Sequence, residues 1–279
     1  MNGFRRTFSA LIRTPQGAVG LLLCLLLLVL TLFGPELAPR DPEQFHFTDR
    51  FAAPSAEFPL GTDWYGRDLL SRVLAGSRST ILLALLATVI GTVAGAAIGI
   101  VSGFLGGRTD EIIMRLNDAL MAIPSLLFAL LILSVLGSSS FNAVVAIGIA
   151  FTPGMARIAR SVTLQAREFD YVSAARARGE GTVWIILAEL LPNVISPVIV
   201  EATIRVAFAV MTLATLSFLG LGAQPPSPEW GLMIAEGRDH MFRSPWPILV
   251  PGVAIALVAI SFNLLGDGLR DALNPQASS

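Results

Sequence analysis

Six runs of apolar residues, separated by polar segments, constrain the fold of this chain more than any other feature. A helix that crosses the roughly 30 Å hydrocarbon core of a bilayer needs about 20 mostly apolar residues. The chain is 54% hydrophobic and 14% charged, whereas soluble domains carry about a quarter charged residues. We therefore predict an all-α polytopic membrane protein with six transmembrane helices. The predicted spans are 17–33, 79–104, 118–136 with an interruption at Pro124, 141–155, 198–221 and 247–265.

The first apolar run, 17–33, follows a basic N-terminal segment and so has the layout of a signal peptide. It is too long for one, and no small-x-small cleavage pattern follows it, so we predict an uncleaved membrane helix. The next segment, 34–77, is acidic and rich in proline, and we predict that it lies outside the membrane. We therefore divide the chain into an N-terminal part, 1–77, and a core, 78–279.

The distribution of basic residues predicts the orientation. Basic residues in short loops favour the cytoplasmic side of a membrane. Eleven of the 19 basic residues fall on one predicted side, together with both chain termini. These are Arg5, Arg6, Arg13, Arg108, Arg115, Arg157, Arg160, Arg167, Arg176, Arg178 and Arg270. We therefore place both termini in the cytoplasm, although Arg72 and Arg78, near the outer end of the second span, do not follow the rule.

The composition excludes several classes of function. Every basic residue is arginine, so the chain lacks the lysine that a phosphate-binding P-loop requires, and any ATPase must be another polypeptide. A single cysteine, Cys24, and two histidines far apart in predicted loops, His46 and His240, predict no disulfide and no metal site. A net charge of -1 argues against a nucleic-acid partner.

Four glycines in the second span recur at a spacing of four residues, close to one helical turn. Gly91, Gly95, Gly99 and Gly103 would lie on one face of a helix. Small residues on such a face allow two membrane helices to approach backbone to backbone. We predict that this face packs against another helix.

The fifth span carries two opposite charges, Glu201 and Arg205, four residues apart. Either charge alone would cost roughly 2.5 to 3.5 kcal/mol at the centre of a membrane. We therefore expect them to pair or to face a wet interior. The sequence leaves open whether the pair is structural or belongs to a translocation pathway.

The polar stretch 167–193 interrupts the apolar second half of the chain. A helix there would show one stripe of small and apolar residues, consisting of Phe169, Val172, Ala175 and Gly179. Gly179 can adopt the left-handed conformation that ends a helix. A second short helix would follow over 183–191 until Pro192 resets the chain. We interpret the stretch as a docking element for another protein, with its stripe as the contact surface.

This stretch resembles the EAA loop of ABC importer membrane subunits. The resemblance is carried by Tyr171-Val172-x-Ala174-Ala175-Arg176-Ala177-x-Gly179, followed after eleven residues by Leu191-Pro192-Asn193. It implies a coupling helix that sits in a groove of an ATPase subunit. The implied coupling residues are Tyr171, Val172, Ser173, Ala174, Ala175, Arg176, Gly179, Leu191 and Pro192. The sequence departs from the family pattern at Ser173, where the family has an acidic residue, and at Glu189, where it has an apolar one.

Three further segments, 60–72, 216–231 and 266–271, are similar to those of the peptide and nickel permeases, specifically the C-type subunit of dipeptide and oligopeptide systems. Leu213 departs from that pattern, since relatives commonly have glutamate there. The resemblance implies the type I ABC importer permease fold. It also implies a prokaryotic cytoplasmic (inner) membrane, and transport of peptides or a similar small solute by alternating access.

The same resemblance implies partners and roles. A homologous second permease, two ATP-binding cassette ATPase subunits and an extracytoplasmic solute-binding protein would join this chain in the bilayer. ATP and Mg would be held by the ATPase subunits, with no cofactor and no catalytic residue in this chain.

The sequence leaves two other classes of function open besides an ABC importer subunit. An ion-coupled secondary transporter could use Glu201 and Arg205 as its coupling pair, and it would need no docking loop. An intramembrane serine protease would need a serine with a basic partner at membrane depth, but lysine is absent and both histidines fall in predicted loops.

Overall fold

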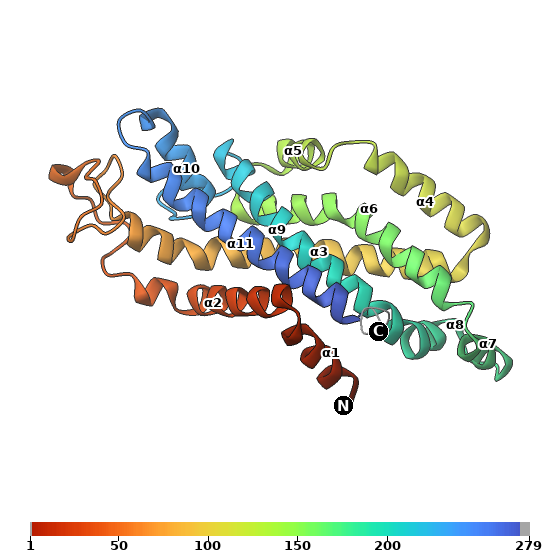
Figure 1. Cartoon of the computed structure of the whole chain (residues 1–279). Coiled ribbons are helices and arrows are strands. Elements are labelled where there is room, and N and C mark those ends of the chain that lie inside the picture. Colours follow the sequence, from red (N-terminus) through yellow and green to blue (C-terminus); the bar gives the residue numbers. More distant parts are fainter. Residues whose placement is uncertain (1, 274–279) are drawn as a thin grey trace.

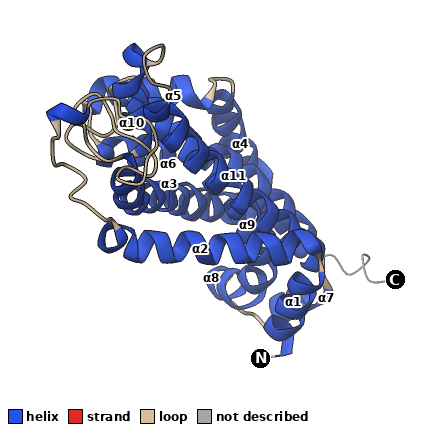
Figure 2. Ribbon diagram, turned by 60° about the vertical axis from the view of Figure 1, so that its left-hand side comes forward, coloured by secondary structure: helices blue, strands red, loops and turns tan. Residues whose placement is uncertain are grey.

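The computed structural model describes residues 2–273, with side chains from residue 8 onward, and within this range it is built from helices and loops (Figures 1 and 2). Most of the longer helices run side by side along the long axis of the molecule. The α-helices are α1 (Asn2–Arg13), α2 (Pro15–Leu37), α3 (Leu69–Leu105), α4 (Gly107–Met121), α5 (Ser125–Leu136), α6 (Ser140–Ala166), α7 (Asp170–Ala177), α8 (Thr182–Trp184), α9 (Leu191–Phe218), α10 (Trp230–Gly237) and α11 (Trp246–Leu273). Short 3-10 turns lie at Phe47–Asp49 and Arg238–His240, and a π-helical stretch lies at Ile185–Leu190.

The number of candidate membrane spans agrees with the predicted six. Five helices are long and apolar enough to cross a bilayer: α2, α3, α6, α11 and the continuous helix Thr182–Phe218. The sixth is a bent pair, in which α4 and α5 meet at an angle of 89°. Pro124 stands at this corner, because proline has no N–H to donate and disfavours helical geometry in the residue before it.

Successive spans place the connecting segments alternately at two ends of the molecule (Figure 1). One end holds α7 and α8, together with the start of α1 and the end of α11. The opposite end holds the long loop between α2 and α3 and the short helix α10. The docking stretch therefore lies at the same end as both termini of the described chain.

Helix α3 is longer than the sequence predicts. It begins at Leu69 rather than near residue 79, because the Asp68 side chain caps it by accepting a hydrogen bond from the Ser71 N–H (3.0 Å). A helix of 37 residues is roughly 55 Å long, well beyond the hydrocarbon thickness, so it is longer than a membrane span requires. The predicted division between 1–77 and 78–279 falls inside this helix.

The glycine face of α3 lies against α6. A methyl group added at Gly91 would come within 2.8 Å of the Gly148 carbonyl oxygen, and one at Gly95 within 2.6 Å of the Thr152 carbonyl oxygen. Gly99 and Gly103 approach the same helix in the same way, near Arg160. The two backbones thus approach closely along four successive turns, because none of these four positions of α3 carries a side chain.

Candidate coupling loop

Helix α7 forms the projecting part of the docking stretch and ends at a glycine. Gly179 has a φ of +81°, and its N–H donates to the Arg176 carbonyl oxygen (3.0 Å). The Glu180 N–H donates to the Ala175 carbonyl oxygen (3.2 Å). These two bonds are the pair that defines a Schellman cap, which needs a left-handed residue at this position.

The middle of the predicted docking stripe of α7 faces its own chain, which corrects the sequence interpretation for Val172 and Ala175, whereas both ends of the stripe are exposed. Val172 and Ala175 are fully buried in an apolar cluster, while Phe169, which should share their stripe, is 56% exposed. At this end of the molecule the spanning helices leave an apolar surface, which these small side chains of α7 cover. The partners in the cluster include Ile100 and Phe104 of α3, Met155 and Ala159 of α6, and Ile185, Leu190 and Val194.

The other side of α7 is open. Asp170, Ser173, Ala174 and Ala177 are all exposed and follow i, i+3, i+4 and i+7 spacing, so they form one face, which we call the outer face of α7. This face has three small side chains and one carboxylate. Another protein could therefore approach the α7 backbone closely there, and Ser173, one of the departures from the family pattern, lies in its middle.

The second departure, Glu189, is compensated within the loop. The Arg178 guanidinium lies 3.4 Å from the Glu189 carboxylate and 3.6 Å from that of Glu180. This bridge joins the two sides of the loop across Gly179. The Tyr171 hydroxyl is buried without a hydrogen-bond partner, and burial, together with the negative charge of Glu189, raises the pKa of Tyr171.

Pro192 does not reset the chain, contrary to the prediction. The helix that starts at Thr182 continues through Leu191 and Pro192 into α9, by way of the π-helical stretch Ile185–Leu190. The Leu191 N–H donates to the Ile186 carbonyl oxygen five residues back. The wider turn accommodates a proline that has no N–H and whose ring would clash with the carbonyl four residues earlier. The coupling loop therefore leads directly into a spanning helix.

Hydrogen bonds and ion pairs of charged residues join α3, α4 and α6 next to the start of the loop. Arg167 of the α6 C-terminus donates to the Gly103 carbonyl oxygen of α3 (2.8 Å). Arg160 of α6 makes a bidentate contact with Asp110 of α4 (2.6 and 2.5 Å). The Asp110 carboxylate also accepts a hydrogen bond from Ser102 of α3 (2.5 Å). From the sequence Arg160 is one residue of the basic side, and nothing in the local pattern identifies Asp110 as its partner.

Glu201 and Arg205 form the predicted pair, at a distance from the coupling loop. Their charged groups lie 3.1 Å apart, and the side chains are 24% and 19% exposed. The Arg205 guanidinium lies against α6, 5.6 Å from the centre of the Phe151 ring. It occupies the space beside Gly154, where an added methyl group would be 2.7 Å from Arg205 Nη2.

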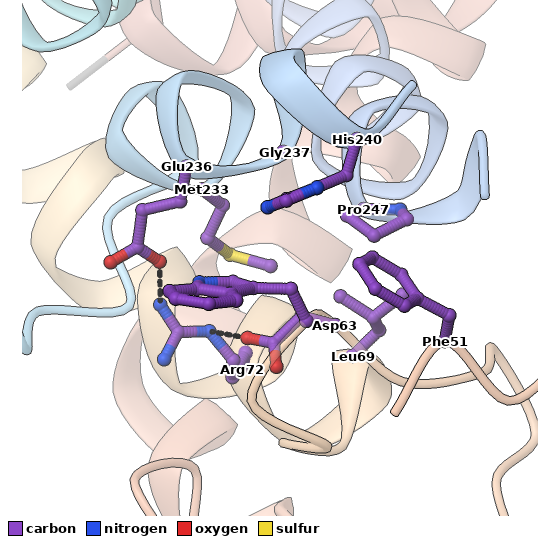
Figure 3. A pocket seen from close by; sticks show the side chains of 10 residues that line it. Phe51, Asp63, Leu69, Arg72, Met233, Glu236, Gly237, His240 and Pro247 are labelled. Atoms are coloured by element: carbon purple, nitrogen blue, oxygen red, sulfur yellow. Dashed lines mark hydrogen bonds and ion pairs between the residues drawn. The ribbon is translucent and has the colours of Figure 1, made fainter. Parts of the chain in front are cut away.

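A buried charge cluster that sequence reasoning missed lies at the opposite end of the molecule. Figure 3 shows Arg72 of α3 between the carboxylates of Asp63 and Glu236, at 3.9 and 3.2 Å. Arg67 binds the same two acids at 2.5 and 2.6 Å. Two positive and two negative charges thus balance, and they tie the loop before α3 to α10. Arg72 and Arg78 are the two basic residues that did not follow the orientation rule. Both charges are paired, Arg72 with the acids of this cluster and Arg78 with Glu36 (3.0 Å).

Comparison with known proteins identifies relatives over nearly the whole chain. A di/tripeptide transport system permease protein, DppC, of Pseudomonas aeruginosa is 43% identical over 269 residues, which cover 94% of this chain and 88% of that protein. A probable D,D-dipeptide transport system permease protein, DdpC, of Escherichia coli is 43% identical over 264 residues, covering 95% and 89%. A glutathione transport system permease protein, GsiD, of Pectobacterium atrosepticum is 39% identical over 259 residues, covering 92% and 86%.

A solved structure shares the fold. A chain of the MetNI methionine ABC transporter, in an inward facing conformation, matches with a TM-score of 0.60 at 16% identity, over 73% of this chain and 97% of that one. A family model described as "binding-protein-dependent transport system inner membrane component" matches residues 95–279. Together with relatives at 43% identity, this match shows that the chain belongs to the family of binding-protein-dependent transport system inner membrane components.

Proposed function

We propose that this chain is the permease subunit of an ABC importer that moves small peptides into the cell, and that the outer face of α7 is its contact with an ATPase subunit. The observation that carries the proposal is the construction of α7. The face that carries Val172 and Ala175 is buried against the rest of the chain, and the helix is capped at Gly179. Its outer face is exposed at the end of the molecule (Figure 1). Such a helix can transmit force to the membrane helices because it is already packed against them.

The peptide solute is inferred from the relatives. The three relatives compared above are named for di/tripeptides, D,D-dipeptides and glutathione. All of these are short peptides with a free carboxylate and a free amino group. The proposed cargo is therefore a short zwitterionic peptide, delivered by a solute-binding protein.

The assembly that we propose has this chain beside a homologous second permease, with two ATPase subunits at the end that holds α7. Those subunits would bind ATP and Mg, and this chain would carry out no covalent chemistry. The binding protein would dock at the end formed by the α2–α3 loop and α10. In this arrangement 95–279, which the family model matches, is the transport core, and α1 and α2 are additions packed on α11.

The mechanism follows from the bracing around α7. Closure of the ATPase subunits on ATP would displace α7, and the displacement would pass to α3 through the hydrogen bond from Arg167 to Gly103 and to α9 through the continuous helix that begins at Thr182. The spanning helices would then open outward. ATP hydrolysis would return them to the inward-open state.

We further propose that both termini and α7 are cytoplasmic, in the cytoplasmic membrane of a prokaryote. A reporter that is active only outside the cytoplasm should be active when fused after Ser55 or after Pro228, and silent after Gly179. An active fusion at Gly179 would contradict the placement of the coupling loop.

The function is tested by purification and reconstitution. The tagged chain, isolated in mild detergent, should bring with it an ATPase and a second permease that mass spectrometry identifies. The complex in vesicles should take up a labelled dipeptide only with ATP and a loaded binding protein. Purification without an ATPase, combined with uptake driven by an ion gradient, would refute the proposal.

A further inference from the structure

Glu201 and Arg205 form a charge pair within the continuous spanning helix Thr182–Phe218, away from both of its ends. Arg205 lies roughly 20 Å before the last residue of that helix, and Glu201 lies roughly 30 Å after its first. Charges at this depth are expensive, and they mark functional positions unless protein encloses them completely.

This chain does not enclose the pair. The side chains of Glu201 and Arg205 remain 24% and 19% exposed, although Gly154 and Phe151 of α6 cover one side of the guanidinium. Contact with lipid on the open side would leave ionised groups unsolvated in hydrocarbon. The open side must therefore meet water or another polar surface.

The guanidinium also has unused binding capacity. Arginine offers five N–H donors, and Arg205 makes one ion pair, through Nη2 at 3.1 Å, with 19% of its side chain still exposed. Guanidinium groups bind carboxylates through two parallel hydrogen bonds, and Glu201 engages only part of this fork. Arg205 can therefore donate hydrogen bonds to a second carboxylate while it stays in place beside Gly154.

We propose that Arg205 is the contact for the carboxylate of the passing solute, and that Glu201 is its resting counter-ion, which takes up the solute's ammonium group when the carboxylate binds. The inference rests on the proposed function, because short peptides are zwitterions. A neutral pair that meets a neutral zwitterion exchanges partners without placing a net charge at the centre of the membrane. That exchange avoids the cost that a single uncompensated charge would carry there.

The test uses the complete importer, reconstituted with its binding protein and with Cys24→Ser, which removes the one cysteine of this chain, and labelling of this chain is read on a gel that separates the subunits. Glu201→Cys should react with a membrane-impermeant thiol reagent in at least one nucleotide state, and dipeptide should slow the reaction. A sulfonate adduct, which restores the negative charge, should recover transport, and a trimethylammonium adduct should not. Ala207→Cys, buried at 2% exposure on the same helix, is the matched control and should not react.

A second variant separates this role from a structural one. Glu201→Gln combined with Arg205→Gln leaves no unpaired charge, so the importer should assemble and its ATPase should still respond to the loaded binding protein. Its apparent KM for dipeptide transport should rise at least about tenfold, the loss expected for a charge-assisted hydrogen bond. Parental transport by this variant, or a cysteine at 201 that never reacts, would overturn the inference. If the parental complex itself transports no peptide, the proposed function fails instead.

Discussion

Replacement of Gly179 by valine tests the coupling loop through backbone conformation alone. A methyl group added at Gly179 would meet nothing within 4 Å, so no steric clash with a neighbour contributes. The cost comes from the φ of +81°, which costs an L-residue about 1–2 kcal/mol, with more expected for a branched side chain. One or two kcal/mol changes the ratio of capped to uncapped loop by about 5 to 30-fold.

Gly181 provides a matched control two residues away. It too has open space around it, but its φ of -72° and ψ of 153° are extended geometry that valine adopts readily. Gly181→Val should therefore leave the loop unchanged. Gly179→Asn should fall between the two variants, because asparagine tolerates the left-handed region better than other residues with a side chain.

The assay is the response of ATP hydrolysis to the loaded binding protein in vesicles, with limited trypsin cleavage after Arg176 and Arg178 as a direct measure of loop opening. Gly179→Val should insert and assemble with its partner permease, cleave faster, and hydrolyse ATP with little response. Equal behaviour of Gly179→Val and Gly181→Val would refute the reasoning, because only Gly179 has the left-handed backbone conformation to which the cost is assigned.

Three further predictions follow from burial and charge. Ala174→Glu, on the outer face of α7, should weaken ATPase binding in a pull-down with little change in Tm. Ala175→Glu, inside the apolar cluster, should lower the Tm of the chain itself, and an unchanged Tm would show that Ala175 faces the partner after all. Gly95→Leu should cost about 1–3 kcal/mol by overpacking α3 against α6, whereas Gly252→Leu, with nothing within 4 Å, should be neutral in the same thermal unfolding assay. Burial raises the pKa of Glu229 above its ordinary value of 4.5, so the folded chain holds this proton to higher pH than the unfolded chain and stability falls as pH rises from 4.5 through the raised pKa. Glu229→Gln should flatten this dependence in Tm measured against pH, and an unchanged slope would assign it to another group.

The hydropathy pattern predicted the spans well, because burial of apolar surface in lipid depends on local composition. It could not predict where a helix continues beyond the membrane. Helix α3 begins at Leu69 because Asp68 caps it and because Arg72 finds Asp63 and Glu236. Those acids lie on other elements, and one of them is far away in sequence.

The direction in which α7 faces was also beyond the sequence. Val172 and Ala175 form one stripe of small side chains, and Ala174 and Ala177 form another, so periodicity alone offers two candidate contact faces. Apolar side chains of α3 and α6 decide which stripe is buried, because they pack against Val172 and Ala175. The spacing of Glu201 and Arg205 did predict their pairing, since an i, i+4 contact depends only on the helix that carries it.

The contact between α3 and α6 has a mechanical consequence. From Gly91 to Gly103 the two backbones touch at four successive turns, so neither helix can roll or slide without separating from the other. The two helices should move together as one rigid body, from Arg167 at the end that holds α7 to the buried charges around Arg72 at the opposite end. Spin labels on α3 and α6 should therefore keep a constant separation between nucleotide states, and a change in that separation would contradict this view. Bending would then be concentrated in joints such as the 89° corner between α4 and α5.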